Sequence, residues 1–347
     1  MLEEEENRVR MARIGIRDVA KAAGVSITTV SKALNGYGDV SNKTREKIEA
    51  IAKELNYEPD LNARALGGRY NVTIALLLSG LEKSDEGGFT FGIISGVYHS
   101  TSESGVEFIL LTTSYASQCE KSYIQLCRQK NVDGAVVIGI RTDDPYYQEV
   151  VQSQIPCVLI DVAIEGKNIV TVSTDNEKAA CEAVSFLIGA GHKNIAMLNG
   201  SVVAEVSKYR FAGYASALEQ AEILLNLDYV AYADFSEALA YEKTLGLMQE
   251  NEEISAIFCA SDIMALGAIR AVKELGKKIP DDISVIGFDD IPTAKYISGG
   301  LTTVRQDPFQ LGKKAGEIVF KMIRKQKTPN HIWIPHEFME RRTTKSK

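Results

Sequence analysis

The amino-acid sequence predicts an all-α head followed by an α/β core of two lobes, each built on a doubly wound parallel sheet. Two patterns support this. Residues 14–70 hold only short helical segments separated by turn residues, whereas from Val72 onward apolar strands alternate with helix-length segments. Such alternation is typical of parallel sheets with helices on both faces. The units outnumber the strands of one ordinary sheet, so we expect two lobes.

Two short helices joined by a glycine turn begin the head. The segment Asp18–Ala23 carries small apolar residues at helical spacing, and Gly24 stands where a C-terminal glycine belongs. Ser26 is a good cap for a second helix, Ile27–Leu34. Two such helices joined by a tight turn are the helix-turn-helix pattern.

A third helix and a short fourth complete the head. Ser41 caps a helix that runs from Asn42 to about Leu55. A last piece, Leu61–Leu66, is capped by Asp60 and followed by two glycines. Because this piece is too short to be a stable helix alone, we expect it to need a partner.

The core alternates between strands and helices over its whole length. The expected strands lie near 72–79, 106–113, 134–140, 156–162, 194–199, 229–233, 255–260 and 283–288. Helix-length segments separate them, among them 176–190, 208–220, 236–249 and 262–275.

Composition and charge narrow the class of protein. No apolar run approaches the roughly 18 residues of a membrane span, and the acidic start Glu3–Glu6 does not fit a secretory signal. Five cysteines without a Cys-x-x-Cys pair indicate reduced thiols in the cytosol. The net charge is −7 overall, but residues 8–70 carry +5 and residues 71–347 carry −8. A basic head on an acidic body favours local contact with DNA.

The head closely resembles the DNA-binding head of the LacI/GalR family of bacterial repressors. The matching residues are Asp18-Val19-Ala20-Lys21-Ala22-Ala23-Gly24-Val25-Ser26, Thr29-Val30-Ser31, Leu34-Asn35-Gly36, Val40-Ser41, Thr44-Arg45, Leu55-Asn56-Tyr57, Pro59 and Ala63-Arg64. The resemblance continues to about Thr344 in Asp161, Asp175-Asn176, Gly191-His192, Arg210, Gly213-Tyr214, Ser261-Asp262, Ala265-Leu266-Gly267, Gly287-Phe288-Asp289-Asp290, Leu301-Thr302-Thr303-Val304, Gln306 and Arg341-Arg342. Gly15 replaces the usual Ser or Thr cap, and Asp60 stands where Asn is common.

The resemblance implies a core like that of the periplasmic sugar-binding proteins, in which the chain crosses between the lobes three times. We place the crossings near Ser173, Arg305 and Pro335. The expected divisions are an N-terminal extension at 1–13, the helix-turn-helix head at 14–58, a hinge helix and linker at 59–70, the N-terminal lobe at 71–173 and 306–334, and the C-terminal lobe at 174–305 and 335–347.

The second head helix is expected to read the major groove with its N-terminal residues. Ile27 and Thr28 are placed to contact base edges, and Lys32 can reach the acceptors of a guanine. The alternatives are core packing for Ile27 and a solvated charge for Lys32. The remaining polar residues suit phosphates, which position the protein without reading sequence; they are Ser26, Thr29, Ser31 and Asn35.

The family resemblance implies that the segment 61–66 folds on DNA and pairs with its partner across the minor groove. Ala63 and Leu66 are the expected contacts. Leu66 aligns with a leucine that wedges between base pairs and kinks the duplex. Core packing is the alternative for Leu66, but a linker beside two glycines offers little core.

The resemblance also implies a small-molecule site in the core. Asp289 and Arg210 could bond sugar hydroxyls, Phe235 could stack on a ring, and Asp161 could close the site from the N-terminal lobe. Helix capping is the structural alternative for Asp289. Weaker candidates are Ser79, Ser261 and Gln306.

The function expected is a cytoplasmic repressor that binds a palindromic operator and is switched by a ligand between the lobes, with a sugar favoured. A homodimer is favoured, because no heptad tail precedes Lys347. Within the family the alternatives are a purine or nucleoside ligand, or a global catabolite regulator that docks a phosphocarrier protein. A transport binding protein is a remote alternative. Catalysis is not expected, because the common catalytic motifs are missing and the four histidines lack ligand spacing; neither a cofactor nor a metal is expected.

Overall fold

The computed structural model describes residues 15–34, 38–55, 57, 72–80 and 88–345. The chain divides into two compact units, Met1–Val72 and Thr73–Lys347, which we call the head and the core. The expected N-terminal extension and hinge helix lie outside the described residues. None of the described helices is long and apolar enough to cross a membrane.

The described residues of the head contain three helices, α2 (Ile16–Ala23), α3 (Ile27–Leu34) and α4 (Asn42–Glu54). Gly24 adopts φ 67°, and the N–H of Val25 donates to the carbonyl of Ala20 at 3.1 Å, which ends α2 in the left-handed turn that its glycine predicts. Ser41 caps α4 by accepting from the N–H of Thr44. The helices bury one small apolar cluster, consisting of Val19, Ala20, Ala23, Val30, Ala33, Val40, Ile48 and Ala52.

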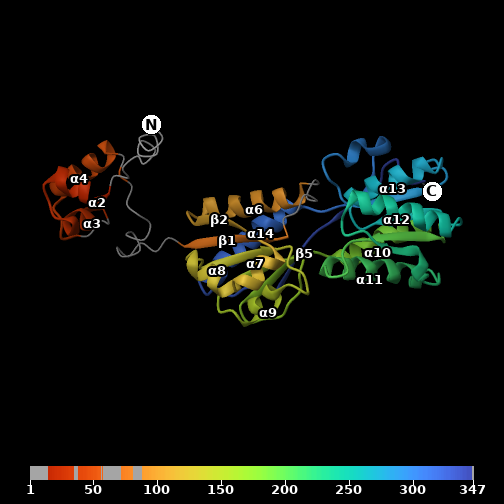
Figure 1. Ribbon diagram of the computed structural model, residues 1–347, viewed down its shortest axis with the longest axis horizontal. Coiled ribbons are helices and arrows are strands. Elements are labelled where there is room, and N and C mark those ends of the chain that lie inside the picture. The colour runs from red at the N-terminus through yellow and green to blue at the C-terminus, as the bar shows by residue number, and fades with distance from the viewer. Residues whose placement is uncertain (1–14, 35–37, 56, 58–71, 81–87, 346–347) are drawn as a thin grey trace, which may run out of the picture. The chain divides into compact units, whose positions relative to one another are not determined.

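Two six-stranded sheets organise the core, one in each lobe (Figure 1). The first has the order β11-β5-β4-β3-β1-β2 and the second β12-β10-β9-β8-β6-β7. The strands of the first are β1 (Thr73–Ser79), β2 (Glu107–Thr113), β3 (Gly134–Ile138), β4 (Cys157–Ile160), β5 (Ile169–Thr174) and β11 (His331–Ile334). Those of the second are β6 (Ile195–Asn199), β7 (Val230–Tyr232), β8 (Ala256–Cys259), β9 (Ser284–Asp289), β10 (Thr302–Arg305) and β12 (Glu337–Met339).

Helices cover both faces of each sheet. In the first lobe α6 packs against α14 on one face, and the side chains of α8 and α9 share a core with the other. In the second, α10 packs against α11 and α12 against α13, on opposite faces of the sheet (Figure 1). The bounds are α6 (Phe89–Glu103), α7 (Tyr115–Glu120), α8 (Tyr123–Gln129), α9 (Pro145–Gln152), α10 (Asn176–Gly189), α11 (Glu205–Gln220), α12 (Glu237–Glu250), α13 (Asp262–Glu274), α14 (Pro308–Ile323), and the 3-10 turns η1 (Leu227–Tyr229) and η2 (Ala294–Gly299).

The all-α head and the two-lobed α/β core confirm the predicted fold class, with one difference in detail. Of the ten strand pairs among the described residues nine are parallel, whereas β12 pairs with β10 in the antiparallel sense. After β11 the chain returns to the second lobe at the edge of the sheet where β10 ends. β12 begins at that edge and runs away from it, which makes it antiparallel to β10. The predicted pattern also missed β5, β10, β11 and β12, which border the three passages between the lobes.

Glycines allow the paired helices to approach closely. A Cβ built on Gly96 of α6 would lie 2.1 Å from the carbonyl oxygen of Phe309, and one on Gly312 of α14 would lie 2.2 Å from that of Ile93. In the second lobe Gly213 and Gly267 meet the neighbouring helix backbone in the same way, at 2.1 and 2.2 Å. The backbones of each pair are therefore in direct contact, and only glycine fits at these four positions.

Replacing Gly96 by alanine should therefore destabilise the core. Because the added methyl group meets backbone on a buried helix, the expected loss is about 1–3 kcal/mol. Gly246 of α12 is the matched control, since a Cβ there meets nothing within 4 Å. Gly246→Ala should instead stabilise by about 0.5–1 kcal/mol through helix propensity. Urea denaturation followed by circular dichroism measures both; equal effects of the two substitutions would contradict the close packing.

Candidate functional site

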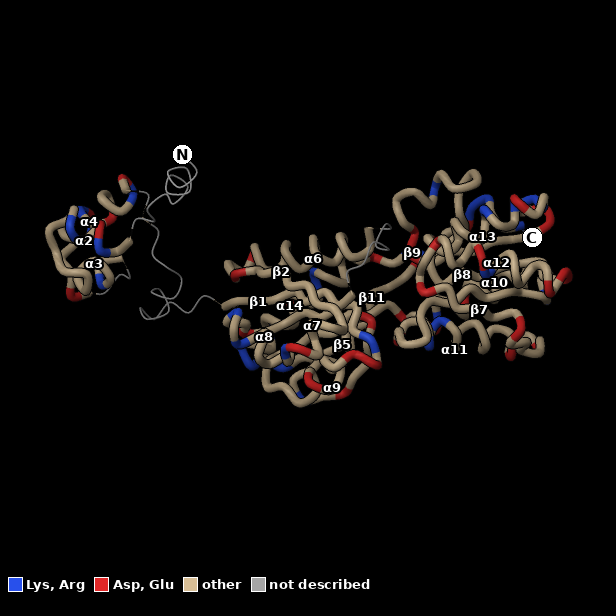
Figure 2. Tube along the Cα trace, viewed as in Figure 1, with Lys and Arg blue, Asp and Glu red and all other residues tan. Residues whose placement is uncertain are grey.

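The first turn of α3 carries side chains that the head does not bury. Ile27 is 45% exposed, so it is not a core residue, and Thr28 beside it is also exposed. Val30 and Ala33 point into the head cluster instead. Each of the three helices carries Lys or Arg (Figure 2). An exposed apolar group, a hydroxyl and nearby cations together suit the edges and backbone of a DNA groove.

Ser26 and Thr29 have a structural task as well as the predicted phosphate contact. The Ser26 hydroxyl accepts from the N–H of Thr29 at 3.1 Å, and the two hydroxyl oxygens lie 2.8 Å apart. One of the two hydroxyls donates to the other, which leaves the second proton available to a phosphate. Ser31 is half-buried, and Lys32 bonds Asp39. The predicted DNA contacts Asn35, Ala63 and Leu66 lie outside the described residues.

A cavity of about 700 Å³ lies between the two lobes, at the carboxyl ends of strands from both sheets. This is where ligands bind in open parallel sheets. All seven predicted ligand residues line it: Ser79, Asp161, Arg210, Phe235, Ser261, Asp289 and Gln306.

Arg210 of α11 is buried and held on several sides. Its Nε donates to Oδ1 of Asn176 at 2.9 Å, its Nη1 donates to the carbonyl of Ala260, and the guanidinium lies 3.8 Å from the centre of the Phe288 ring. Burial lowers the pKa of Arg210, while the charges of Asp289 and Asp161 oppose that effect. Two of its five N–H groups serve these bonds, so the remaining ones can serve a ligand in a fixed direction.

Asp161 faces Arg210 from the other lobe, directly after β4. Its backbone adopts φ 59°, and Oδ1 accepts from Nδ2 of Asn176 at 3.4 Å. Burial raises the pKa of Asp161 to about 6, against the attraction of Arg210. Asn176 therefore bridges the two charged residues.

Asp289 ends β9 and is joined to the second passage between the lobes. Its Oδ1 accepts from Nε2 of Gln306 at 2.8 Å, and its φ is 117°. Gln306 is buried, and its Oε1 has no hydrogen-bond partner among the described residues. Ser261 caps α13 by accepting from the N–H of Met264 at 3.2 Å, so its own proton remains available as a donor.

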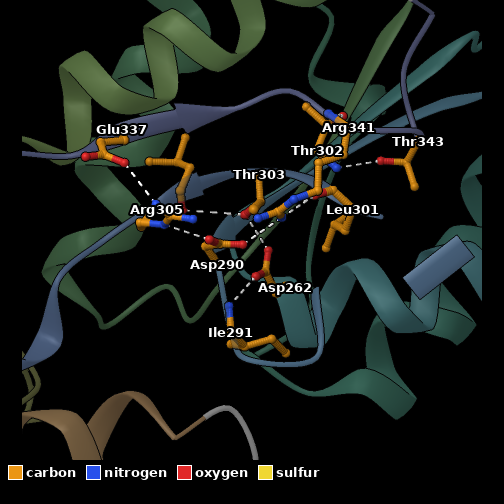
Figure 3. Close-up of polar contacts among 11 residues, drawn as sticks. Asp262, Asp290, Ile291, Leu301, Thr302, Thr303, Arg305, Glu337, Arg341 and Thr343 are labelled. Carbon is orange, nitrogen blue, oxygen red and sulfur yellow. Dashed lines mark hydrogen bonds and ion pairs between the residues drawn. The ribbon is translucent and has the colours of Figure 1, made fainter. Parts of the chain in front are cut away.

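The neighbouring Asp262 and Asp290 bond residues of their own lobe (Figure 3), and neither is among the residues that line the cavity. Asp290 accepts from Arg305 at 2.8 Å and pairs with Arg341 at 2.7 Å, and these arginines keep the pKa of Asp290 low although burial alone would raise it. Asp262 accepts from Thr303 at 2.6 Å and from the N–H of Ile291 at 2.9 Å. Asp289 and Asp290 are thus adjacent in sequence, but Asp289 lines the cavity whereas Asp290 bonds arginines of the lobe.

Phe235 forms an aromatic wall of the cavity. A Cβ built on Gly200 would lie only 2.0 Å from the ring, so the ring rests directly on the glycine backbone after β6. Phe235 and the preceding Asp234 both have a positive φ, of 57° and 47°. The turn and the glycine together fix the ring at the cavity.

Ser79 lines the cavity, but its hydroxyl is engaged within its own lobe. It donates to Asp144 and accepts from Gln118, both at 2.9 Å. Ser79 can therefore only accept from a ligand, which weakens it as a candidate. Sequence reasoning missed Arg141, which lines the cavity and bonds Asp143 through two nitrogens at 2.9 and 2.8 Å. Its place just beyond β3, at the same sheet edge as Asp161, was the available signal.

Comparison with known proteins agrees with this architecture. Residues 15–60 match the model of the bacterial regulatory proteins of the lacI family, and residues 184–344 match that of the periplasmic binding protein-like domain. The HTH-type transcriptional repressor PurR of Yersinia enterocolitica serotype O:8 / biotype 1B is 32% identical over 331 residues, covering 94% of this chain and 96% of the relative. The chain belongs to the LacI family.

Solved structures of LacI-family regulators superpose on most of the chain. The lac repressor dimer bound to operator and the anti-inducer ONPF is 28% identical and gives a TM-score of 0.82, covering 96% of this chain and 99% of that one. The transcriptional regulator CelR in complex with cellobiose, also 28% identical, gives 0.71 over 95% of this chain and 100% of that one. This LacI-family protein is a DNA-binding transcriptional repressor and not an enzyme.

One contact joins the lobes at the rim of the cavity. Thr142, beyond β3, donates from its N–H at 3.0 Å and from its hydroxyl at 3.2 Å to the carbonyl of Val203, in the loop after β6. Both bonds must break for the lobes to separate at this point. They therefore hold the two lobes of this LacI-family core together at the rim.

Removing the hydroxyl of Thr142 should make opening easier. Thr142→Val keeps the shape of the side chain and the N–H but loses one hydrogen bond, worth about 1 kcal/mol or a factor of about five in the opening equilibrium. Hydrogen exchange of the Thr142 amide should speed up about fivefold, whereas Thr142→Ser should exchange like the wild type. If the amide exchanges equally fast in the valine variant and in the wild type, the hydroxyl bond at the rim does not hold the lobes together.

Proposed function

We propose that this repressor binds a palindromic operator as a homodimer and is switched by a sugar bound between the lobes of its core. The observation that carries the proposal is the cavity, in which fixed polar groups from both lobes surround an aromatic wall. The basic head binds the DNA, and a ligand in the cavity regulates that binding. We place the protein in the cytosol, where an operator is accessible.

Recognition of the operator is assigned to α3 and to the segment before the core. Ile27 and Thr28, exposed at the start of α3, are the proposed base contacts together with Lys32. The proposed phosphate contacts are Ser26, Thr29, Ser31 and Asn35. Ala63 and Leu66 are proposed to enter the minor groove. A two-fold operator follows from a two-fold dimer.

Exposed apolar side chains on the first lobe support a homodimer. Phe91 and Tyr98 of α6 are 72% and 58% exposed, and Leu110 of the edge strand β2 is 45% exposed. The Tyr98 and Phe108 rings lie 6.1 Å apart, so α6 and the edge strand β2 contact each other beside these exposed side chains. Such a surface suits a second copy, and a similar protein, the lac repressor, is a dimer on its operator.

The polar groups of the cavity match a hydroxyl-rich ligand. Arg210 offers donors in a fixed direction, Asp161 and Asp289 offer acceptors, and Phe235 offers a flat apolar face. Ser261 and Gln306 add a donor and an acceptor, while Ser79 adds an acceptor. The volume of about 700 Å³ is within the range of small-molecule sites. The similar regulator CelR forms a complex with cellobiose.

A purine or nucleoside is the second candidate ligand, because the Phe235 ring would stack equally well on a planar base. A phosphocarrier protein as an additional partner belongs to the catabolite-regulator alternative, and its addition to the binding assay distinguishes that case. A transport binding protein would not need the helix-turn-helix head.

The switch is proposed to act through the passages between the lobes. Gln306 lies on the second passage and bonds Asp289, so a ligand that takes over this carboxylate changes the bonding of the passage itself. Arg305 beside it holds Asp290 and, at 3.0 Å, Glu337 at the third passage. A ligand that prefers one angle between the lobes shifts the population toward that angle.

Titration of the purified protein against a labelled palindromic duplex with a central CG step tests the function. Fluorescence anisotropy at fixed salt, with and without mono- and disaccharides, purines and a phosphocarrier, should show nanomolar binding that one sugar releases. Strengthening by a compound would instead identify a corepressor. Asp289→Asn is the control, expected to bind DNA normally and to lose the response. Binding no stronger than to random DNA under every addition would contradict the proposal.

Effector binding should depend on pH through Asp161. A ligand hydroxyl that donates to this carboxylate favours its ionised form, so the affinity is full above the pKa of about 6 and falls as the pH drops through it. Between pH 7 and pH 5 the expected loss is roughly tenfold by isothermal titration calorimetry. Asp161→Asn should bind more weakly and lose most of this dependence. An unchanged pH profile in the asparagine variant would remove Asp161 from the site.

A further inference from the structure

Lys32 and Asp39 form an ion pair beside the exposed first turn of α3. Lys32 lies on the last turn of α3, and its ammonium bonds the carboxylate of Asp39, in the turn that precedes the Ser41 cap of α4. Both side chains are about half exposed, at 43% and 54%. The hydrogen bond from Lys32 lowers the pKa of Asp39, so the carboxylate is ionised at neutral pH.

Folding stability does not account for this pair. An exposed lysine–carboxylate pair adds little to stability and is screened by salt. A carboxylate close to a DNA-reading helix also repels phosphates, so it opposes binding to DNA of any sequence. The contribution of Asp39 must therefore come from its bond to Lys32.

Asp39 restricts the direction in which Lys32 can donate. A free lysine has a flexible stem, and any phosphate within reach satisfies its charge. While Asp39 accepts from it, the ammonium is held near one position, and part of its charge is neutralised. The loss of freedom on binding is then smaller at a site where the acceptor lies in the right place.

The pair presents a donor next to an acceptor, and this pattern has a complement in the major groove. Guanine offers two acceptors, N7 and O6, which suit the ammonium of Lys32. The cytosine paired with it offers the N4 amino group, which suits the carboxylate of Asp39. A G·C pair can thus satisfy both members at once, whereas a phosphate satisfies only the lysine.

We propose that Asp39 is a positioning residue that determines specificity, because it directs Lys32 to one G·C pair and weakens binding to all other sequences. The inference rests on the proposed placement of α3 in the major groove. It extends the DNA-reading residues beyond α3 to the turn that follows it.

The test uses the full-length protein and a duplex selected by the wild type from a random library. The probes are the selected duplex, its single-base-pair variants and a random-sequence duplex. Asp39→Asn should bind the random duplex roughly fivefold to tenfold more tightly, with a salt slope steeper by about one. Its preference for G·C at one position should fall roughly tenfold. Glu49→Gln is the matched control, because Glu49 is exposed on α4 and its substitution removes the same charge.

The double variant decides whether Asp39 acts through Lys32. Lys32→Gln should lose the same base preference, and adding Asp39→Asn to it should change that preference no further. Thermal unfolding should be alike in all variants. The inference is overturned if Asp39→Asn and Glu49→Gln shift every duplex equally, which is a general charge effect. If the wild type enriches no sequence at all, operator binding itself is contradicted, and the inference with it.

Discussion

The buried guanidinium of Arg210 is the charge around which the polar groups of the cavity are arranged. A buried cation costs several kcal/mol unless it is paired and hydrogen-bonded. Its hydrogen bonds and ring contact come from the second lobe, but its opposing charges come from both lobes, Asp161 in the first and Asp289 in the second. The electrostatic balance of the cavity is therefore shared, and a ligand that bonds any of these groups acts on both lobes together.

The polar residues around the cavity divide into those that hold the lobes and those that face the space between them. Asp290 and Asp262 are fully occupied by arginine, threonine and backbone partners, and their strong bonds fix the end of β9. Asp289, one residue earlier, is bonded to the passage residue Gln306 instead. This separation allows the site to respond to a ligand without loss of the lobe's own structure.

Much of the fold and the cavity could be predicted from the sequence. The apolar strands and the helix caps are local signals, whereas Asp161 and Asp289 are predicted from the family resemblance; the structure places them directly after β4 and at the end of β9. Short strands such as β12 carry no such signal, because their partners are set by how the chain returns between lobes. The engagement of Ser79 by Asp144 and the pairing of Lys32 with Asp39 depend on residues that only folding brings together.

The glycines between paired helices have a mechanical consequence. Where the backbone of α6 touches that of α14, no free volume remains to absorb a displacement, and the same holds for α10 against α11 and α12 against α13. Close packing of this kind resists relative movement of the paired helices, so we expect each lobe to move largely as one body. A shift imposed at the cavity should reach the far edge of the first sheet, where β1 begins, without being damped on the way.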